Sequence, residues 1–92
     1  MFKSIDKKFE EIGFIKVDDD KHIVTYERKN EKHNYTQVLG ITYKSNGKHI
    51  IQSYDKDLMD SKIIGDTCIG LTYYEMKLAL KKMKQLGFHK SK

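Results

Sequence analysis

The chain has 92 residues, of which 38% are apolar and 34% are charged, and its formal net charge at pH 7 is +5. This length predicts one domain, residues 1–92, with a single modest core. Every apolar run is far shorter than the ~20 residues that cross a bilayer, and the first residues lack the apolar stretch of a signal peptide. Cys68 is the only cysteine, which excludes an internal disulfide. We therefore expect a cytoplasmic protein without membrane contact.

The first predicted element is a helix from Ile5 to Ile12. Ser4 is a residue type that favours the N-cap position. Apolar residues recur along the segment at helical spacing: Phe2, Ile5, Phe9 and Ile12. Gly13 is expected to end the helix in a Schellman motif, in which Phe14 packs back on Phe9.

Strand candidates follow. Phe14–Val17 is a short candidate that ends at the acidic turn of residues 18–20. His22–Arg28 and Tyr35–Lys44 are rich in β-branched and aromatic residues, which favour strands. Asn46-Gly47 then predicts a type I′ hairpin, because that turn needs positive φ at both central residues.

The predicted hairpin fixes a register for the sheet. A two-residue turn at Asn46-Gly47 pairs Tyr43 with Ile50 and Ile41 with Gln52. The predicted core face of the sheet carries Leu39, Ile41, Tyr43, Ile50 and Tyr54. Gln52 also falls on this face, so it needs a polar partner or a position at the sheet margin. The other face carries Val38, Thr42, Ile51 and Ser53, a mixed surface that is a candidate contact face.

The last predicted element is a helix within Leu71–Phe88. Thr72 and Glu75 have the spacing of a capping box, and Gly87 is expected to end the helix. The residues expected to lie on the sheet are Met76, Ala79, Leu80, Met83 and Leu86. Leu78 falls outside this stripe and is predicted to be partly exposed.

Together these elements predict an α+β fold with the order α-β-β-β(-β)-α. We expect a three- to four-stranded antiparallel meander with the N-terminal and C-terminal helices packed on one face. Residues 55–70 mix acidic and apolar residues without a clear period. The sequence leaves that segment open between an ordered loop and a short hairpin.

A basic surface is the leading candidate site for a partner or nucleic acid. Lysines recur at i, i+4 and i+7 on the last helix, tyrosines occupy its first turn, and two more lysines flank the hairpin. The candidate residues are Lys77, Lys81, Lys82, Lys84, Tyr73, Tyr74, Lys44 and Lys48. Exposed tyrosine beside lysine suits a protein contact or base stacking. Lysines near a helix C-terminus also complement the helix dipole without any partner.

The acidic residues, histidines and cysteine do not have the spacing of a catalytic site or of a metal site. Three consecutive acids at residues 18–20 cannot all reach one cation, and the four histidines lack the short spacing of a zinc site. Cys68 is expected to be a small buried or half-buried residue, since a nucleophile would need a base supplied by the fold. Phosphate loops and nucleophile elbows do not occur. We predict no enzyme, no metal and no cofactor.

The combination of HIIQSY (residues 49–54) with the capped helix GLTYYEMKLALKKMKQLG (residues 70–87) resembles small uncharacterised proteins carried by phages and prophages of low-GC Gram-positive bacteria. The resemblance implies an accessory protein in the host cytoplasm. The favoured function is non-enzymatic protein–protein contact, either as a homodimer or with another protein. Nucleic-acid binding through the basic helix is the alternative. Arg28 is the only arginine, and nucleic-acid readers usually rely on arginine.

Overall fold

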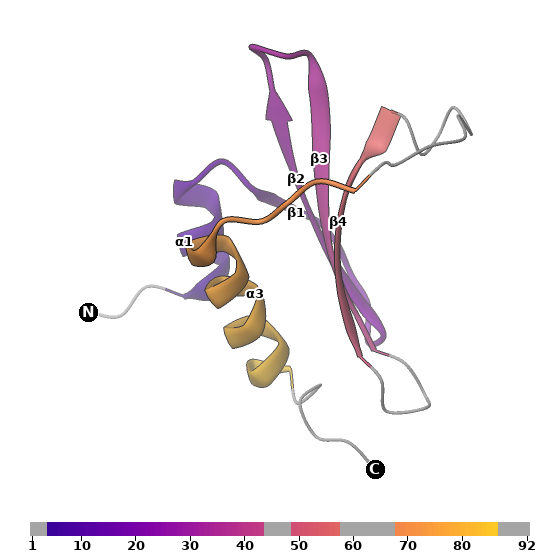
Figure 1. Ribbon diagram of the computed structural model, residues 1–92. Coiled ribbons are helices and arrows are strands. Elements are labelled where there is room, and N and C mark those ends of the chain that lie inside the picture. The colour runs from indigo at the N-terminus through magenta and orange to yellow at the C-terminus, as the bar shows by residue number, and fades with distance from the viewer. Residues whose placement is uncertain (1–3, 44–48, 58–67, 87–92) are drawn as a thin grey trace.

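In the computed structural model, residues 4–43, 49–57 and 68–86 are described. The helices and strands are α1 (Ile5–Glu11), β1 (Ile15–Asp19), β2 (Ile23–Asn30), β3 (Tyr35–Thr42), β4 (Ile50–Asp55) and α3 (Tyr73–Gln85). The strands form one antiparallel sheet in the order β1-β2-β3-β4. Both helices lie side by side on one face of this sheet (Figure 1). The predicted α+β fold is confirmed, with four strands.

The predicted ends of α1 are also confirmed. The Ser4 hydroxyl accepts a hydrogen bond from the Lys7 amide at 3.1 Å. Gly13 has a φ of +94°, and the Phe14 amide donates to the Phe9 carbonyl at 2.9 Å, as a Schellman motif requires. The Phe9 and Phe14 rings meet edge to face with centroids 5.9 Å apart. This stop turns the chain directly from α1 into β1.

The acidic segment is part of a strand rather than a turn. Asp18 and Asp19 belong to β1, whose pairing with β2 shifts by one residue between Lys16 and Asp18. This shift is a β-bulge, which bends the strand at the sheet edge. The turn itself follows at Asp20, whose carboxylate accepts a hydrogen bond from the His22 amide at 2.8 Å.

The predicted register of β3 with β4 is wrong by one residue. Ile41 pairs with Ile51 and Thr42 pairs with Ile50. Because side chains alternate along a strand, this slip moves every β4 side chain to the other face. Ile51 and Ser53 therefore face the helices, while Gln52 is exposed on the outer face and needs no buried partner. Asn46-Gly47 lies outside the described residues.

The core lies between the sheet and the two helices. Its fully buried members are Phe9, Phe14, Val24, Tyr26, Leu39, Ile41, Leu78 and Ala79. The Phe9 ring stacks on the Tyr26 ring with centroids 4.2 Å apart, which joins α1 to β2. Of the helices described, none has the length and apolar character needed to cross a membrane.

Helix α3 begins as predicted but presents a different face to the sheet. The Thr72 hydroxyl accepts from the Glu75 amide at 3.1 Å, and the Glu75 carboxylate accepts from the Thr72 amide at 3.0 Å. The residues that α3 buries are Glu75, Leu78, Ala79 and Lys82. Leu78 is 1% exposed, whereas Met76 and Leu80 are 38% and 52% exposed. The predicted core stripe is thus correct for Ala79 and wrong for Met76 and Leu80.

The physical reason for this rotation is electrostatic. Glu75 forms an ion pair with Arg28 on β2, and Lys82 forms one with Asp6 on α1. Both pairs draw the same side of α3 toward the rest of the fold, and Leu78 lies between them along the chain. Met83 and Leu86 still reach the core as partly buried residues, as predicted.

Candidate interaction surface

Most of the predicted contact residues of α3 are on its exposed side. Lys77, Lys81 and Lys84 are exposed, as are Tyr73 and Tyr74. The Lys77 ammonium group lies 5.3 Å from the centre of the Tyr73 ring, a cation–π contact. Within the described part of the chain, these three lysines have no carboxylate within ion-pair distance. Their charges are therefore available to a partner.

Lys82 does not belong to this basic surface, contrary to the prediction. It is 7% exposed, and its ammonium group lies 3.1 Å from an Asp6 carboxylate oxygen and 3.1 Å from the Gln85 side-chain oxygen. Successive residues of a helix are rotated by about 100° around its axis, so Lys82 faces α1 although its neighbour Lys81 is exposed. The remaining predicted lysines, Lys44 and Lys48, lie outside the described residues.

Asp6 is the centre of an ionic cluster that joins both helices to β1 and β2. Its carboxylate accepts hydrogen bonds from the Tyr26 hydroxyl at 2.6 Å and from the Lys16 ammonium group at 3.0 Å, and it pairs with Lys82. Burial raises the pKa of Asp6, but these hydrogen bonds lower it more, and the pKa falls to about 2. Burial and the bond to Asp6 raise the pKa of Tyr26. All three donors are committed to holding the fold.

Arg28 is also committed to the interior. Its guanidinium group lies 2.9 Å from a Glu75 carboxylate oxygen, donates to the Gln37 side-chain oxygen at 2.8 Å, and stacks 4.2 Å from the Phe14 ring centre. Gln37 in turn donates to the Ser53 hydroxyl at 2.8 Å. The single arginine therefore joins β2, β3, β4 and α3, and several of its donors are used within the fold.

A groove lies beside β4 on the side toward α3. Its volume is about 330 Å³, and we call it the α3–β4 groove, lined mainly by Ile51, Ser53, Tyr54, Ile69, Leu71 and Met76. The volume falls at the lower end of the range for ligand and anchor pockets. The described residues of its walls are chiefly apolar and include no carboxylate, lysine or histidine. The groove is therefore equipped to bind apolar groups rather than to transfer protons.

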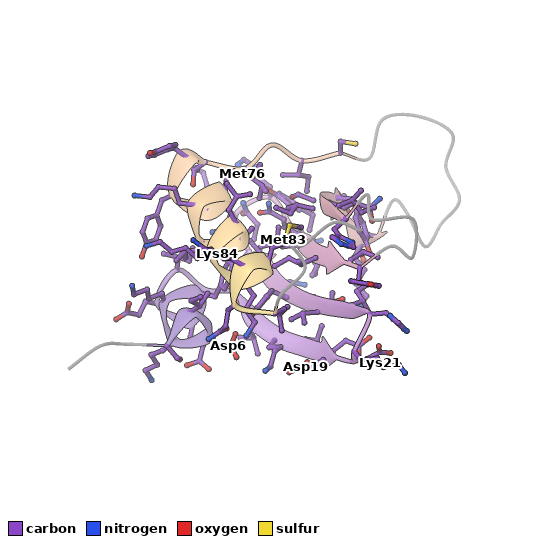
Figure 2. All side chains as sticks on the ribbon, turned by 90° about the horizontal axis from the view of Figure 1, so that it is seen from below. Asp6, Asp19, Lys21, Met76, Met83 and Lys84 are labelled. Carbon is purple, nitrogen blue, oxygen red and sulfur yellow. The ribbon has the colours of Figure 1, made fainter. Side chains whose placement is uncertain are left out.

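Exposed apolar residues of α3 extend this groove. Tyr73, Met76 and Leu80 follow one another at helical spacing on the exposed side, and we call them the apolar flank of α3. Met83 lies further along the same helix, toward the strands (Figure 2). The sequence pattern did not predict this surface, because it assigned Met76 and Leu80 to the core.

The predicted mixed contact face is only partly present on the outer face of the sheet. Val38 and Thr42 lie on this face as predicted, but Ile51 and Ser53 lie on the opposite one. Neither helix covers the outer face, and yet Val38 is only 3% exposed. A partner that covered Val38 would remove little further apolar area from water, so the residue would add little to the free energy of binding.

The remaining acidic, histidine and cysteine side chains that the structure describes form no recognisable site. In the described ranges, no three His, Cys, Asp or Glu side chains are grouped so that they could hold a metal ion. Cys68 is exposed at the groove, whereas a buried or half-buried position was expected. His22 and His49 flank the Tyr43 ring, with centroid distances of 5.7 Å and 4.4 Å.

Comparison with known proteins adds no information on the function of this surface. The chain was compared with protein-family models, with curated proteins and with solved structures, and none of the three comparisons found a match.

Proposed function

We propose that this chain is a non-enzymatic accessory protein that acts through contact with another protein. One observation carries the proposal: α3 buries Glu75 and Lys82 and leaves Met76 and Leu80 at the surface beside the α3–β4 groove. Exposing large apolar side chains together costs free energy that a partner recovers, at about 25 cal/mol per Å² covered. Contiguous apolar surface beside a groove is typical of protein-contact sites.

The ionisable groups support contact rather than catalysis. Among the described residues, the groups whose pKa values shift are Asp6, Lys16 and Tyr26. They belong to the ionic cluster between the helices and the sheet, and none of them lines the groove. A catalytic site usually places its perturbed groups in the pocket. The sequence resemblance adds the setting, a phage or prophage accessory protein in the host cytoplasm.

Site-specific photo-crosslinking tests this proposal. A benzophenone amino acid replaces Leu80 in one variant and Ile15 in a second, which is a matched control because Ile15 is a similarly exposed apolar residue on β1. Irradiation of cells of a low-GC Gram-positive host should give a discrete protein adduct at position 80 and none at position 15. A product of twice the 10.9 kDa chain mass would identify a homodimer. The absence of any protein adduct at position 80 would contradict the proposal.

Nucleic-acid binding is the second candidate, supported by Lys77, Lys81 and Lys84 beside Tyr73. Fluorescence anisotropy with labelled single-stranded and duplex DNA tests it at low salt. Three phosphate contacts on duplex DNA predict a log–log salt slope of about −2.7. The replacement of all three lysines by glutamine should abolish both the binding and the slope. If neither DNA binds at low salt, this candidate is removed.

A further inference from the structure

We infer that the α3–β4 groove binds an acidic, extended segment of a different protein, which pairs with the edge of β4 and inserts apolar side chains into the groove. This inference rests on the proposed function and specifies the chemistry of the partner. It is carried by three observations on the described residues of one side of the molecule: a strand edge that they leave partly unpaired, an apolar groove, and a basic stripe without ion-pair partners among them.

The outer edge of β4 is able to accept another strand. The Ile69 amide donates to the Ser53 carbonyl on this edge at 2.9 Å, so among the described residues the 68–69 segment covers the C-terminal half of the edge. Because backbone groups alternate along a strand, Ile51 directs its N–H and C=O to the same outer edge. None of the turn, loop and cap hydrogen bonds between described backbone groups uses them. An extended peptide is able to pair there, as in β-strand addition.

The two sheet edges differ in their protection. β1 carries a bulge and the charged residues Lys16, Asp18 and Asp19, which are devices that block strand addition. The described part of β4 from Ile50 to Tyr54 has no charged residue and no bulge. Strand addition is thus directed to β4, where alternate side chains of the added strand point into the α3–β4 groove.

The charge of the occupant follows from α3. Lys77 and Lys84 flank Leu80 at i−3 and i+4, and Lys81 follows it directly, so the apolar flank is bordered by three ammonium groups without ion-pair partners in the described chain. Carboxylates of an incoming segment gain attraction there, and more so where the apolar contact excludes water. A segment that combines apolar and acidic residues is able to fill the α3–β4 groove and to pair with the lysines of α3.

Two other occupants fit less well. A second copy of this chain carries a net charge of +5 and would bring like charges together along α3. A nucleic acid would satisfy the lysines, but its phosphates would not fill a groove walled by Ile51, Leu71 and Met76. Both are outcomes of the test below.

Selection from a random 12-residue display library on the full-length chain tests the inference. The selected peptides should be net negative and should alternate apolar with other residues. A synthetic consensus peptide should bind at least tenfold more weakly to Leu80→Gln and to the double variant Lys77→Gln/Lys84→Gln. N-methylation of its backbone should also weaken binding, because it removes the hydrogen bonds to β4. Ile15→Gln and Lys29→Gln/Lys32→Gln are the matched controls, and they should bind normally.

Each contrary result has a distinct meaning. Neutral or basic peptides that still depend on Leu80 would overturn the acidic partner but leave a protein-contact function in place. Binding that tolerates backbone methylation would overturn strand addition. Sedimentation that shows a dimer lost in Leu80→Gln, or DNA binding lost in the same variant, would assign the surface to a second copy or to nucleic acid. If no peptide depends on Leu80 and position 80 forms no crosslink, the proposed function itself fails.

Discussion

Gly13 adopts a left-handed backbone conformation that other residue types reach only at a cost. Its φ is +94°, and an added Cβ would lie 3.1 Å from the Arg28 Cδ atom. Gly13→Ala is therefore expected to reduce the free energy of unfolding by about 1–2 kcal/mol, measured by urea denaturation. Gly70→Ala is the control, because a Cβ there meets no atom within 4 Å. Equal losses for both variants would refute a special role for Gly13.

Asp6 is expected to make stability depend on acid pH. Its folded pKa of about 2 lies below the ordinary value of 3.8. Above about pH 5 the carboxylate is ionised in both the folded and the unfolded state, and its stabilisation is fully present. As the pH falls toward 2, the unfolded chain takes up the proton first, so the stabilisation is lost. Because Asp6 is partly exposed, solvent screening limits this contribution to about 1–2 kcal/mol.

Urea denaturation at pH 5 and at pH 2.5 measures this contribution. The wild-type chain should lose about 1 kcal/mol more than Asp6→Asn over this interval, since the amide does not titrate. Glu31→Gln, which changes an exposed turn carboxylate, should lose as much as the wild type. Identical pH dependence in the wild type and Asp6→Asn would contradict the low pKa of Asp6.

Helix α3 depends on the capping box that opens it. Thr72→Ala removes the acceptor of the Glu75 amide hydrogen bond and should cost about 1 kcal/mol in thermal or urea unfolding. Thr72→Ser retains a hydroxyl at the same position and should keep the stability within a few tenths of a kcal/mol. If serine were as destabilising as alanine, the loss would come from the Thr72 methyl group instead of the cap.

The ends of the helices were predictable because they depend on neighbouring residues. Ser4, Gly13 and Thr72 act on backbone groups within a few positions, so residue type and spacing are sufficient. The register of β4 was not predictable in this way. It depends on which of Ile50 and Ile51 packs against the helices, and both have the same residue type.

The rotation of α3 depends on contacts distant in sequence. Apolar periodicity predicted that Met76 and Leu80 face the sheet, but Glu75 and Lys82 find opposite charges on β2 and α1 and face inward instead. The local sequence of α3 does not show that Arg28 and Asp6 lie opposite Glu75 and Lys82 in the fold. The apolar flank and the groove were missed for this reason. The exposure of Lys77, Lys81 and Lys84 was predicted correctly from their helical spacing.

The molecule as a whole has two unequal surfaces. On the outer face of the sheet, Val38 is almost fully buried and Glu27 is paired with Lys56 at 3.2 Å, while the exposed apolar residue Ile15 lies on the edge strand β1. The opposite side combines the half of the β4 edge that the described residues leave unpaired, the α3–β4 groove, and three lysines without ion-pair partners in that part of the chain. The proposed contact surface therefore lies on the side of α3, and it exists only if Met76 and Leu80 are turned away from the core.

The unfolding free energies of Leu78→Ala and Leu80→Ala measure that rotation directly. The two leucines are two positions apart on α3, and their exposed fractions are 1% and 52%. Leu78→Ala should cost about 2–4 kcal/mol through the cavity it leaves in the core, whereas Leu80→Ala should change stability by no more than about 0.5 kcal/mol. A larger loss for Leu80→Ala than for Leu78→Ala would place Leu80 in the core and remove the exposed surface on which the proposed function rests.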